Sequence, residues 1–211
     1  LQGLKVIIDC AHGAYSSYAP EILEKLGAEV ITLHVQPNGK NINNLSGSLH
    51  PQELIKAVLD KKAHVGIAFD GDGDRVILVT PDGSIKDGDD LLALLITHPF
   101  YHTQSTIVGT IMSNQGLEQH LKHLGKNLVR TAVGDKNVVQ KMIKENLLLG
   151  AEPSGHVILR DFSDTSDGLF TALRSLECMV LTKNWNLETF VKYFQYTGKI
   201  PVSFKRDLLE E

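Results

Sequence analysis

The chain has 211 residues, of which 42% are hydrophobic and 22% charged, a composition that supports a globular core. Its formal charge is −4 and no more than two basic residues are consecutive, which excludes a polyanion-binding stripe, so we expect no nucleic acid partner. No apolar run reaches the roughly 18 residues that span a bilayer, so we expect no membrane partner either. The two cysteines, Cys10 and Cys178, predict buried free thiols in a reducing compartment and hence a cytoplasmic location.

The first half of the chain alternates apolar runs with amphipathic segments. Strands are expected where β-branched and apolar residues cluster, and helices where apolar residues recur every three or four positions. Pro20 and Pro51 stand where helices commonly begin, and Gly27 stands where one commonly ends. In chain order, the pattern predicts a strand over 5–10, a helix over 20–26, a strand over 29–35, a helix over 51–59, a strand over 65–69, and a hairpin of 76–79 with 84–85.

The pattern restarts after the polar stretch 87–90. It predicts a helix over 90–97, a strand over 106–112, a helix over 115–124, a strand over 127–131, a helix over 136–145, strands over 147–151 and 157–159, a helix over 168–182, and a last helix that Asn186 caps and that places Phe190, Val191 and Phe194 as its apolar positions. Two such passes predict two similar three-layer α/β domains with mixed, largely parallel sheets. We expect them over 1–88 and 89–200, with a charged linker over 201–211.

One segment carries three carboxylates at alternating positions. Asp70, Asp72 and Asp74 directly follow an apolar strand and are separated by glycines, so the loop can curl and point the side chains inwards. Like charges this close repel, and a hard cation relieves the repulsion. All-oxygen ligands favour Mg²⁺, Ca²⁺ or Mn²⁺ over zinc, and we expect Mg²⁺. The adjacent Arg75 either pairs with the acidic loop or holds a phosphate oxygen near the metal.

Two other interpretations of this loop fit less well. A solvated turn accounts for the Asp-Gly pairs, but not for their place at the carboxyl end of a buried strand. An EF-hand also uses alternating aspartates, but it needs glycine at its sixth position and glutamate at its twelfth, where this chain has Arg75 and Pro81. The flanking segments are also expected to be strands rather than helices.

The segment 70–75 resembles the metal loop of the α-D-phosphohexomutase superfamily. Further segments resemble the bacterial phosphoglucosamine mutase family within it and together run through nearly the whole chain: 9–14, 37–43, 109–114, 133–135 and 150–159. The resemblance implies the second and third of four domains, without the first-domain phosphorylated serine and the fourth-domain phosphate grip. The start at a strand, without an initiator Met, raises the same expectation of a fragment, which by itself would be inactive.

The resemblance also assigns roles to individual residues. The three loop aspartates would bind Mg²⁺ together with a phosphoserine oxygen from outside the chain, and Arg75 would contact phosphate. The residues expected to contact the phosphosugar substrate are Glu152, Ser154 and His156 in one loop and Asp135 and Lys136 in another. Structural roles stay open for several of them: a capped turn for Glu152 and Ser154, a packed position for His156, and a helix N-cap for Asp135.

The implied activity is interconversion of glucosamine 6-phosphate and glucosamine 1-phosphate, by Mg²⁺-assisted phosphoryl transfer through the missing phosphoserine. Phosphomannomutase or phosphoglucomutase activity is the alternative within the superfamily, and a non-catalytic metal-binding module is the alternative outside it. Four departures from the family pattern bear on substrate preference: His12 and Pro153 in place of Asn, Lys136 in place of Arg, and Ser166 in place of Gly. None of them removes an expected metal ligand.

Overall fold

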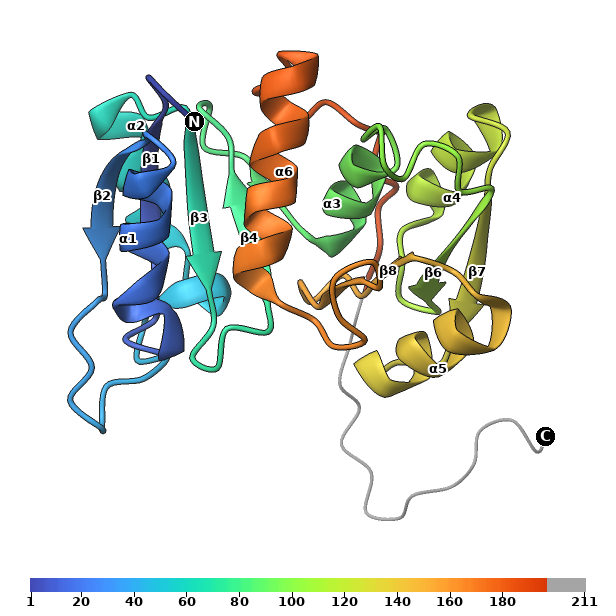
Figure 1. The fold of residues 1–211 in the computed structure, drawn as a ribbon, viewed down its shortest axis with the longest axis horizontal. Coiled ribbons are helices and arrows are strands. Elements are labelled where there is room, and N and C mark those ends of the chain that lie inside the picture. The colour runs from blue at the N-terminus through green and yellow to red at the C-terminus, as the bar shows by residue number, and fades with distance from the viewer. Residues whose placement is uncertain (197–211) are drawn as a thin grey trace.

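The computed structural model describes residues 1–196, which form two β-sheets flanked by helices (Figure 1). The first sheet has the strand order β2-β1-β3-β4-β5. Strands β1, β2 and β3 run parallel, and β4 and β5 continue the sheet in antiparallel fashion. The strands are β1 (Lys5–Asp9), β2 (Glu29–Leu33), β3 (Val65–Phe69), β4 (Val76–Val79) and β5 (Ile85–Lys86).

The second sheet repeats the connectivity of the first four strands, with the order β7-β6-β8-β9. The first strand of the unit, β6, is again central and pairs in parallel with the next two strands of the sequence, β7 and β8. The last strand, β9, pairs with β8 in antiparallel fashion at the edge of the sheet. The strands are β6 (Thr106–Thr110), β7 (Asn127–Thr131), β8 (Leu149–Ala151) and β9 (Val157–Leu159). The expected pair of similar α/β units with largely parallel sheets is confirmed.

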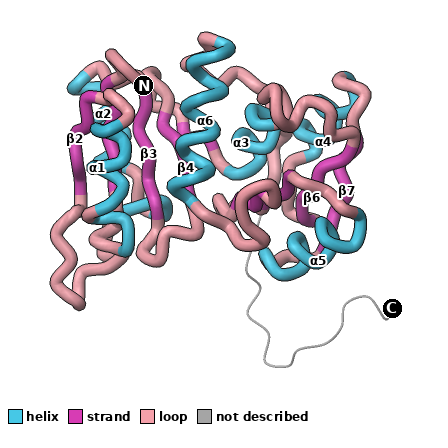
Figure 2. The backbone as a smooth tube through the Cα atoms, in the orientation of Figure 1, coloured by secondary structure: helices cyan, strands magenta, loops and turns pink. Residues whose placement is uncertain are grey.

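Helices cover both faces of each sheet (Figure 2). They are α1 (Tyr18–Lys25), α2 (Gln52–Lys61), α3 (Gly88–Leu95), α4 (Gln115–His123), α5 (Asp135–Glu145) and α6 (Gly168–Thr182). Because side chains alternate along a strand, neighbouring residues of β1 serve different layers. Ile8 packs in one cluster with Leu23 of α1, while Ile7 packs on the other face with Leu54 of α2.

The central strand of the second sheet alternates in the same way. Ile107 packs in the cluster that contains Leu117 of α4, and Val108 faces Val138 and Met142 of α5. The helix after the first strand of each unit therefore covers one face, and the helix after the second strand covers the other. Three layers in each unit follow from this alternation.

Helices α3 and α6 join the two units. Helix α6 follows β9, yet it also packs against β3 and β4 of the first sheet, while α3 packs against β8, α4 and α6 (Figure 1). One hydrophobic cluster accordingly runs from Val6 through Leu91 to Leu176. The two sheets thus share a continuous core, and the division of the sequence at residue 88 stays a prediction.

One expected helix is wrong. Residues 183–196 contain no helix: α6 ends where Lys183 takes a left-handed φ of 55°, and the chain then runs alongside α4. The Asn114 side chain accepts a hydrogen bond from the Tyr193 N–H and donates one to the Tyr193 carbonyl, both at 2.9 Å. The Tyr193 backbone is therefore hydrogen-bonded to a side chain of α4's N-cap, and not to other residues of a helix that starts at Asn186. The predicted linker over 201–211 lies outside the described residues.

Helix α1 differs from its expected start, since it begins at Tyr18 rather than at Pro20. Proline is tolerated there because the first-turn N–H groups have no partner within the helix. Over residues 1–196, no helix combines the length and the apolar content that crossing a membrane requires.

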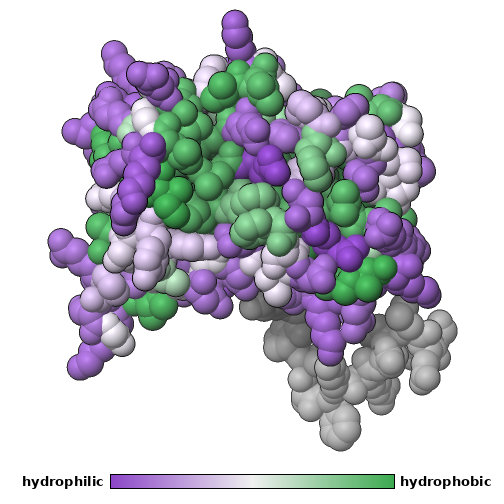
Figure 3. Space-filling model, viewed as in Figure 1, coloured by the Kyte–Doolittle hydropathy of each residue, from purple (hydrophilic) through white to green (hydrophobic). Residues whose placement is uncertain are grey.

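One face of the molecule gathers apolar side chains over α1 and α6 (Figure 3). A groove of about 440 Å³ on this face is lined by Leu26 next to α1 and by Phe170, Leu173, Val180 and Leu181 of α6. Helix α6 therefore presents apolar side chains to this groove as well as to the sheets, although its Arg174 and Glu177 also line the groove.

Candidate active site

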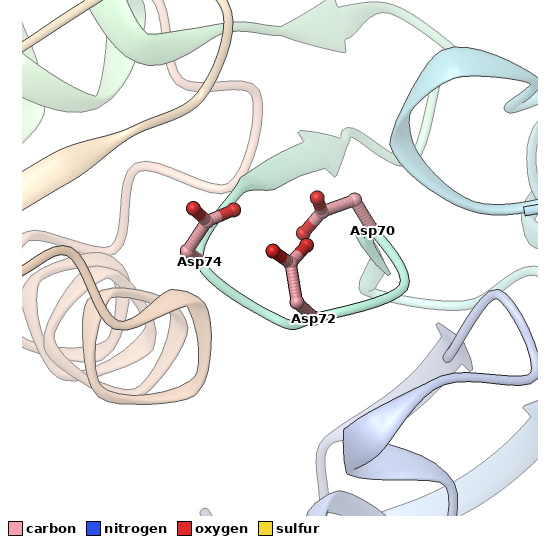
Figure 4. Close-up of side chains that lie close together, drawn as sticks. All are labelled: Asp70, Asp72 and Asp74. Carbon is pink, nitrogen blue, oxygen red and sulfur yellow. The ribbon is translucent and has the colours of Figure 1, made fainter. Parts of the chain in front are cut away.

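The three aspartates lie on the loop between β3 and β4, at the carboxyl end of the parallel strands (Figure 4). Oxygens from Asp70, Asp72 and Asp74 all lie within 4.8 Å of one another. Asp70 is buried, Asp74 is half-buried and Asp72 is exposed. The structure therefore brings together all three expected metal ligands, on a loop that is open on the side of Asp72.

Asp70 is the most constrained of the three. Its Oδ1 accepts the backbone N–H groups of Gly73, at 3.2 Å, and Arg75, at 3.1 Å. Its Oδ2 lies 2.9 Å from Arg75 Nε and 2.7 Å from Nη2. Arg75 thus forms the expected ion pair with the acidic loop, and its contact with phosphate stays a prediction.

The donor set fits a hard divalent cation. Asp74 Oδ1 is buried without a hydrogen-bond partner in the described part of the chain, since Arg75 Nε is 3.7 Å away. An octahedral Mg²⁺ with oxygens at about 2.1 Å needs ligand oxygens roughly 3 to 4 Å apart. The three carboxylates, within 4.8 Å of one another, are close to that spacing.

The expected sugar-contacting loop, 152–156, connects β8 and β9. The Glu152 carboxylate is buried, and its Oε1 accepts the Gly134 N–H at 2.8 Å. His156 Nδ1 lies 3.1 Å from both Glu152 Oε2 and Ser154 Oγ. The Glu152 backbone also closes the turn by hydrogen bonds to Gly155 and His156. These contacts fix the loop and leave Ser154 exposed at its tip.

This loop lies directly against the aspartate loop, 70–75. His156 Nε2 is 3.3 Å from Asp74 Oδ2, so the imidazole bridges a carboxylate of each loop. The backbones also meet, because Arg75 and His156 form an antiparallel bridge and the Val76 N–H donates to the Gly155 carbonyl at 3.1 Å. Residues about 80 positions apart in the sequence thus form one continuous site.

Asp135 and Lys136 lie at the amino end of α5, where both are exposed. The alternative role of Asp135 as an N-cap is wrong, because Gly134 takes that position and Asp135 is the first helical residue. Gly134 touches this site through its N–H to Glu152. A cavity of about 200 Å³ beside this loop is lined by Thr110, Met112, Val133, Glu152, Pro153 and Ser154.

Tyr15 and Asp167 also reach the site, although no sequence pattern indicated a contact between them. The Tyr15 hydroxyl donates to Asp167 Oδ1 at 2.8 Å, across 152 positions of sequence. Asp167 was recognisable as the residue before a helix, and its Oδ1 does cap α6 by accepting the Phe170 N–H. Tyr15 carried no local signal, because its partner lies in the other half of the chain.

The two thiols are shielded from solvent. Both Cys10 and Cys178 are free and buried, as expected. Burial raises the pKa of the Cys10 thiol to about 12, and burial also raises the pKa of Cys178. Neither thiol is therefore ionised near neutral pH, which removes the nucleophilic form.

Comparison with known proteins identifies the family. Residues 87–195 match the family model described as phosphoglucomutase/phosphomannomutase, alpha/beta/alpha domain III, and residues 1–83 match the model of domain II. The chain belongs to the phosphoglucomutase/phosphomannomutase family. The aspartate loop, 70–75, lies within the domain II match, and the 152–156 loop lies within the domain III match.

Curated relatives named phosphoglucosamine mutase cover most of the chain. The one from Sulfurovum sp. (strain NBC37-1) is 42% identical over 99% of this chain, and the one from Parvibaculum lavamentivorans is 48% identical over 83%. The chain spans 48% and 40% of the lengths of these two relatives. The resemblance to the phosphoglucosamine mutase family, within the phosphohexomutase superfamily, is confirmed.

Solved structures of the superfamily share the fold. A phosphoglucomutase/phosphomannomutase family protein from Burkholderia thailandensis is 29% identical, with a TM-score of 0.76 over 84% of this chain and 40% of its own. An N-acetylphosphoglucosamine mutase from Aspergillus fumigatus, in complex with GlcNAc-6P and magnesium, is 16% identical, with a TM-score of 0.66 over 90% of this chain and 50% of its own. At that identity the second likeness concerns the fold alone.

Proposed function

We propose that this chain is the central part of a phosphoglucosamine mutase, which interconverts glucosamine 6-phosphate and glucosamine 1-phosphate. The catalytic phosphoserine and the grip on the substrate phosphate would come from the first and fourth domains of the same polypeptide. The observation that carries the proposal is the contact between the two loops, where His156 joins Asp74 to Glu152. The names of the curated relatives support the choice of glucosamine.

In this proposal, Asp70, Asp72 and Asp74 hold Mg²⁺, with a phosphoserine oxygen as a further ligand. Bound there, Mg²⁺ supplies positive charge that stabilises the phosphoryl group during transfer. Arg75 shares its guanidinium with Asp70, so its position is fixed before substrate arrives. Its proposed role is to hold a phosphate oxygen beside the metal.

The 152–156 loop would orient the sugar. Glu152 and Ser154 offer a carboxylate and a hydroxyl, which suit hydrogen bonds to sugar hydroxyl groups, and both line the small cavity. We assign His156 a bridging role and a sugar contact, and place Asp135 and Lys136 at the rim of the cleft. Because Glu152 is held by the Gly134 N–H, its carboxylate needs little reorganisation on binding.

Turnover by the full-length enzyme tests the substrate. We expect kcat/KM to be highest for glucosamine 6-phosphate among the glucosamine, glucose and mannose 6-phosphates. A strong preference for mannose or glucose phosphate would instead establish phosphomannomutase or phosphoglucomutase activity. Absence of turnover on all three, with an intact phosphoserine loop in the full-length protein, would favour a non-catalytic metal-binding module.

Metal binding by this chain gives a second test. Without the phosphoserine ligand, we expect calorimetry to show only weak Mg²⁺ binding, on the order of millimolar for an oxygen site with few protein ligands. Micromolar affinity in the same chain would mean that the aspartates need no outside ligand. A cytoplasmic location also belongs to this proposal, since both cysteines are free thiols.

A further inference from the structure

The amino end of α6 supports the metal loop from behind. The Gly168 N–H donates to the Gly73 carbonyl at 2.8 Å, and Gly73 is the residue between Asp72 and Asp74. The Gly73 N–H donates in turn to Asp70 Oδ1. Both backbone groups of this glycine are therefore held, one by a metal-loop carboxylate and the other by a helix from the opposite half of the chain.

The ring of Tyr15 covers the remaining side of Gly73. Gly73 has a left-handed φ of 83°, and a Cβ at this position would lie 2.5 Å from Tyr15 Cε2. The same ring packs edge-on against Phe69, the residue before Asp70, with centroids 5.0 Å apart. Tyr15 thus contacts the metal loop both at its start and at its middle.

The Tyr15 hydroxyl reaches the residue that caps α6. Asp167 Oδ1 accepts hydrogen bonds from both the Tyr15 hydroxyl and the Phe170 N–H, each at 2.8 Å. Burial, and then the hydrogen bond to Asp167, raise the pKa of Tyr15. The hydroxyl therefore remains a protonated donor at neutral pH.

We propose that Tyr15 is a positioning residue for the cation site, acting through Asp167 and the amino end of α6 to hold Gly73 and so to set the separation of the Asp72 and Asp74 carboxylates. The inference rests on the proposed metal site. According to this inference, a contact between the two halves of the chain fixes the positions of the metal-binding carboxylates. Mg²⁺ demands near-ideal octahedral geometry, so small shifts of a ligand weaken binding more than they weaken the fold.

The test compares two hydroxyl deletions in the 211-residue chain. Tyr15→Phe removes the hydroxyl and keeps the ring, and Tyr101→Phe is its matched control, because the Tyr101 hydroxyl also donates to an aspartate, Asp161, at 2.6 Å. Free Mn²⁺ is counted by electron paramagnetic resonance, since Mn²⁺ accepts the same oxygen ligands. We expect Tyr15→Phe to weaken Mn²⁺ binding about 10-fold, as loss of a group that orients metal ligands commonly does. Tyr101→Phe should lower Tm and leave Mn²⁺ affinity unchanged.

Substitutions of Asp167 test whether the Tyr15 hydroxyl acts through this residue. Asp167→Asn keeps an acceptor oxygen and should bind Mn²⁺ nearly as the unmodified chain does, whereas Asp167→Ala should weaken binding as Tyr15→Phe does. In the Asp167→Ala background, Tyr15→Phe should have no further effect, because the hydroxyl acts through Asp167. If Tyr15→Phe does not fold, a comparison of Mn²⁺ binding by Asp167→Ala and Asp167→Asn tests the same inference.

Asp72→Asn separates this inference from the proposed function. If Asp72→Asn leaves Mn²⁺ affinity unchanged, the three aspartates are not the cation site and both proposals fall. If Asp72→Asn abolishes binding while Tyr15→Phe binds as Tyr101→Phe does, the cation site stands and the positioning role of Tyr15 is wrong. Loss of binding in Asp72→Asn, together with weakened binding in Tyr15→Phe and Asp167→Ala but not in Tyr101→Phe or Asp167→Asn, supports that role.

Discussion

The loops 70–75 and 152–156 hold the same place in the two sheets, between the last parallel strand and its antiparallel neighbour. The first loop carries three carboxylates and Arg75, whereas the second carries Glu152 with Ser154 and His156. Their surroundings differ as well. Arg75 and backbone N–H groups satisfy only Asp70, but the Gly134 N–H and His156 both reach the one carboxylate of the second loop.

This difference explains how a repeated topology yields two kinds of binding group. Surplus negative charge, which Arg75 does not balance, makes the first loop a candidate for a cation. A single carboxylate with its partners in place makes the second loop suited to neutral hydroxyl groups. The loops then combine into one site, because His156 contacts Asp74.

The covering helices show that the two units are not independent. Helix α6 belongs to the second unit by sequence and packs against β3 and β4 of the first, next to α3. Stability should therefore be shared between the units.

The largest expected effect follows from removing α6. A chain of residues 1–88 lacks the helix that covers part of the first sheet, so Phe69 and Val76 would lose apolar cover. We expect this piece to show no cooperative thermal transition, whereas residues 1–196 should show a single one. Circular dichroism melts of the two pieces provide the measurement. A cooperative transition in 1–88 would mean that the first unit is stable without α6.

Replacement of one carboxylate by an amide in each loop tests whether only the first loop binds a cation. Asp70→Asn should weaken Mn²⁺ binding by roughly 10- to 100-fold, because it removes a charged ligand and unpairs Arg75. Glu152→Gln is the matched control and should leave the Mn²⁺ affinity of the chain within about twofold. Titration followed by electron paramagnetic resonance measures both. Equal losses in the two variants would contradict the assignment of the cation to the first loop.

Truncation of a buried side chain of α6 tests whether the two units share one core. Leu176 is fully buried in the cluster that spans both sheets, and Leu176→Ala should cost about 3 kcal/mol of unfolding free energy. Val180→Ala, one turn further along the same helix, should cost less than about 1 kcal/mol, because Val180 is 42% exposed. Urea unfolding should give one transition for each variant. Two separate transitions in Leu176→Ala would show that the units unfold independently.

The smallest effect concerns pH and the amino end of α3. Asp89 is buried, its Oδ1 has no hydrogen-bond partner among residues 1–196, and burial raises its pKa to about 6. Protonated Asp89 is thus favoured in the folded state, so its contribution to stability is full below pH 3.8, the ordinary value, and is lost as the pH rises through 6.

Asp89→Asn removes this titration and serves as the reference. Between pH 4 and 7, the stability of the unmodified chain relative to Asp89→Asn should fall by about 2 kcal/mol, measured by urea unfolding at each pH. A difference that stays constant, or that grows with pH, would show that folding does not raise the pKa of Asp89.

Much of the fold could be predicted from the sequence because its signals are local. Both helices that follow a central strand end in a Leu-Gly pair, Leu26-Gly27 and Leu124-Gly125, where the glycines have φ values of 88° and 69°. Such a stop is specified within a few residues. The aspartate loop was equally readable, since carboxylates that alternate with glycines directly after a buried strand are typical of a cation site.

The tertiary structure decided what depends on distant partners. The chain after α6 carries an N-cap residue and apolar positions, yet Asn114 holds its backbone in a non-helical path. The contact of His156 with Asp74 and that of Tyr15 with Asp167 join residues that no local pattern relates. The sequence by itself determined most of the helices and strands, the aspartate loop and the family. Only the tertiary structure decided how these parts meet, because the packing of α3 and α6 depends on buried surface contributed by both halves at once.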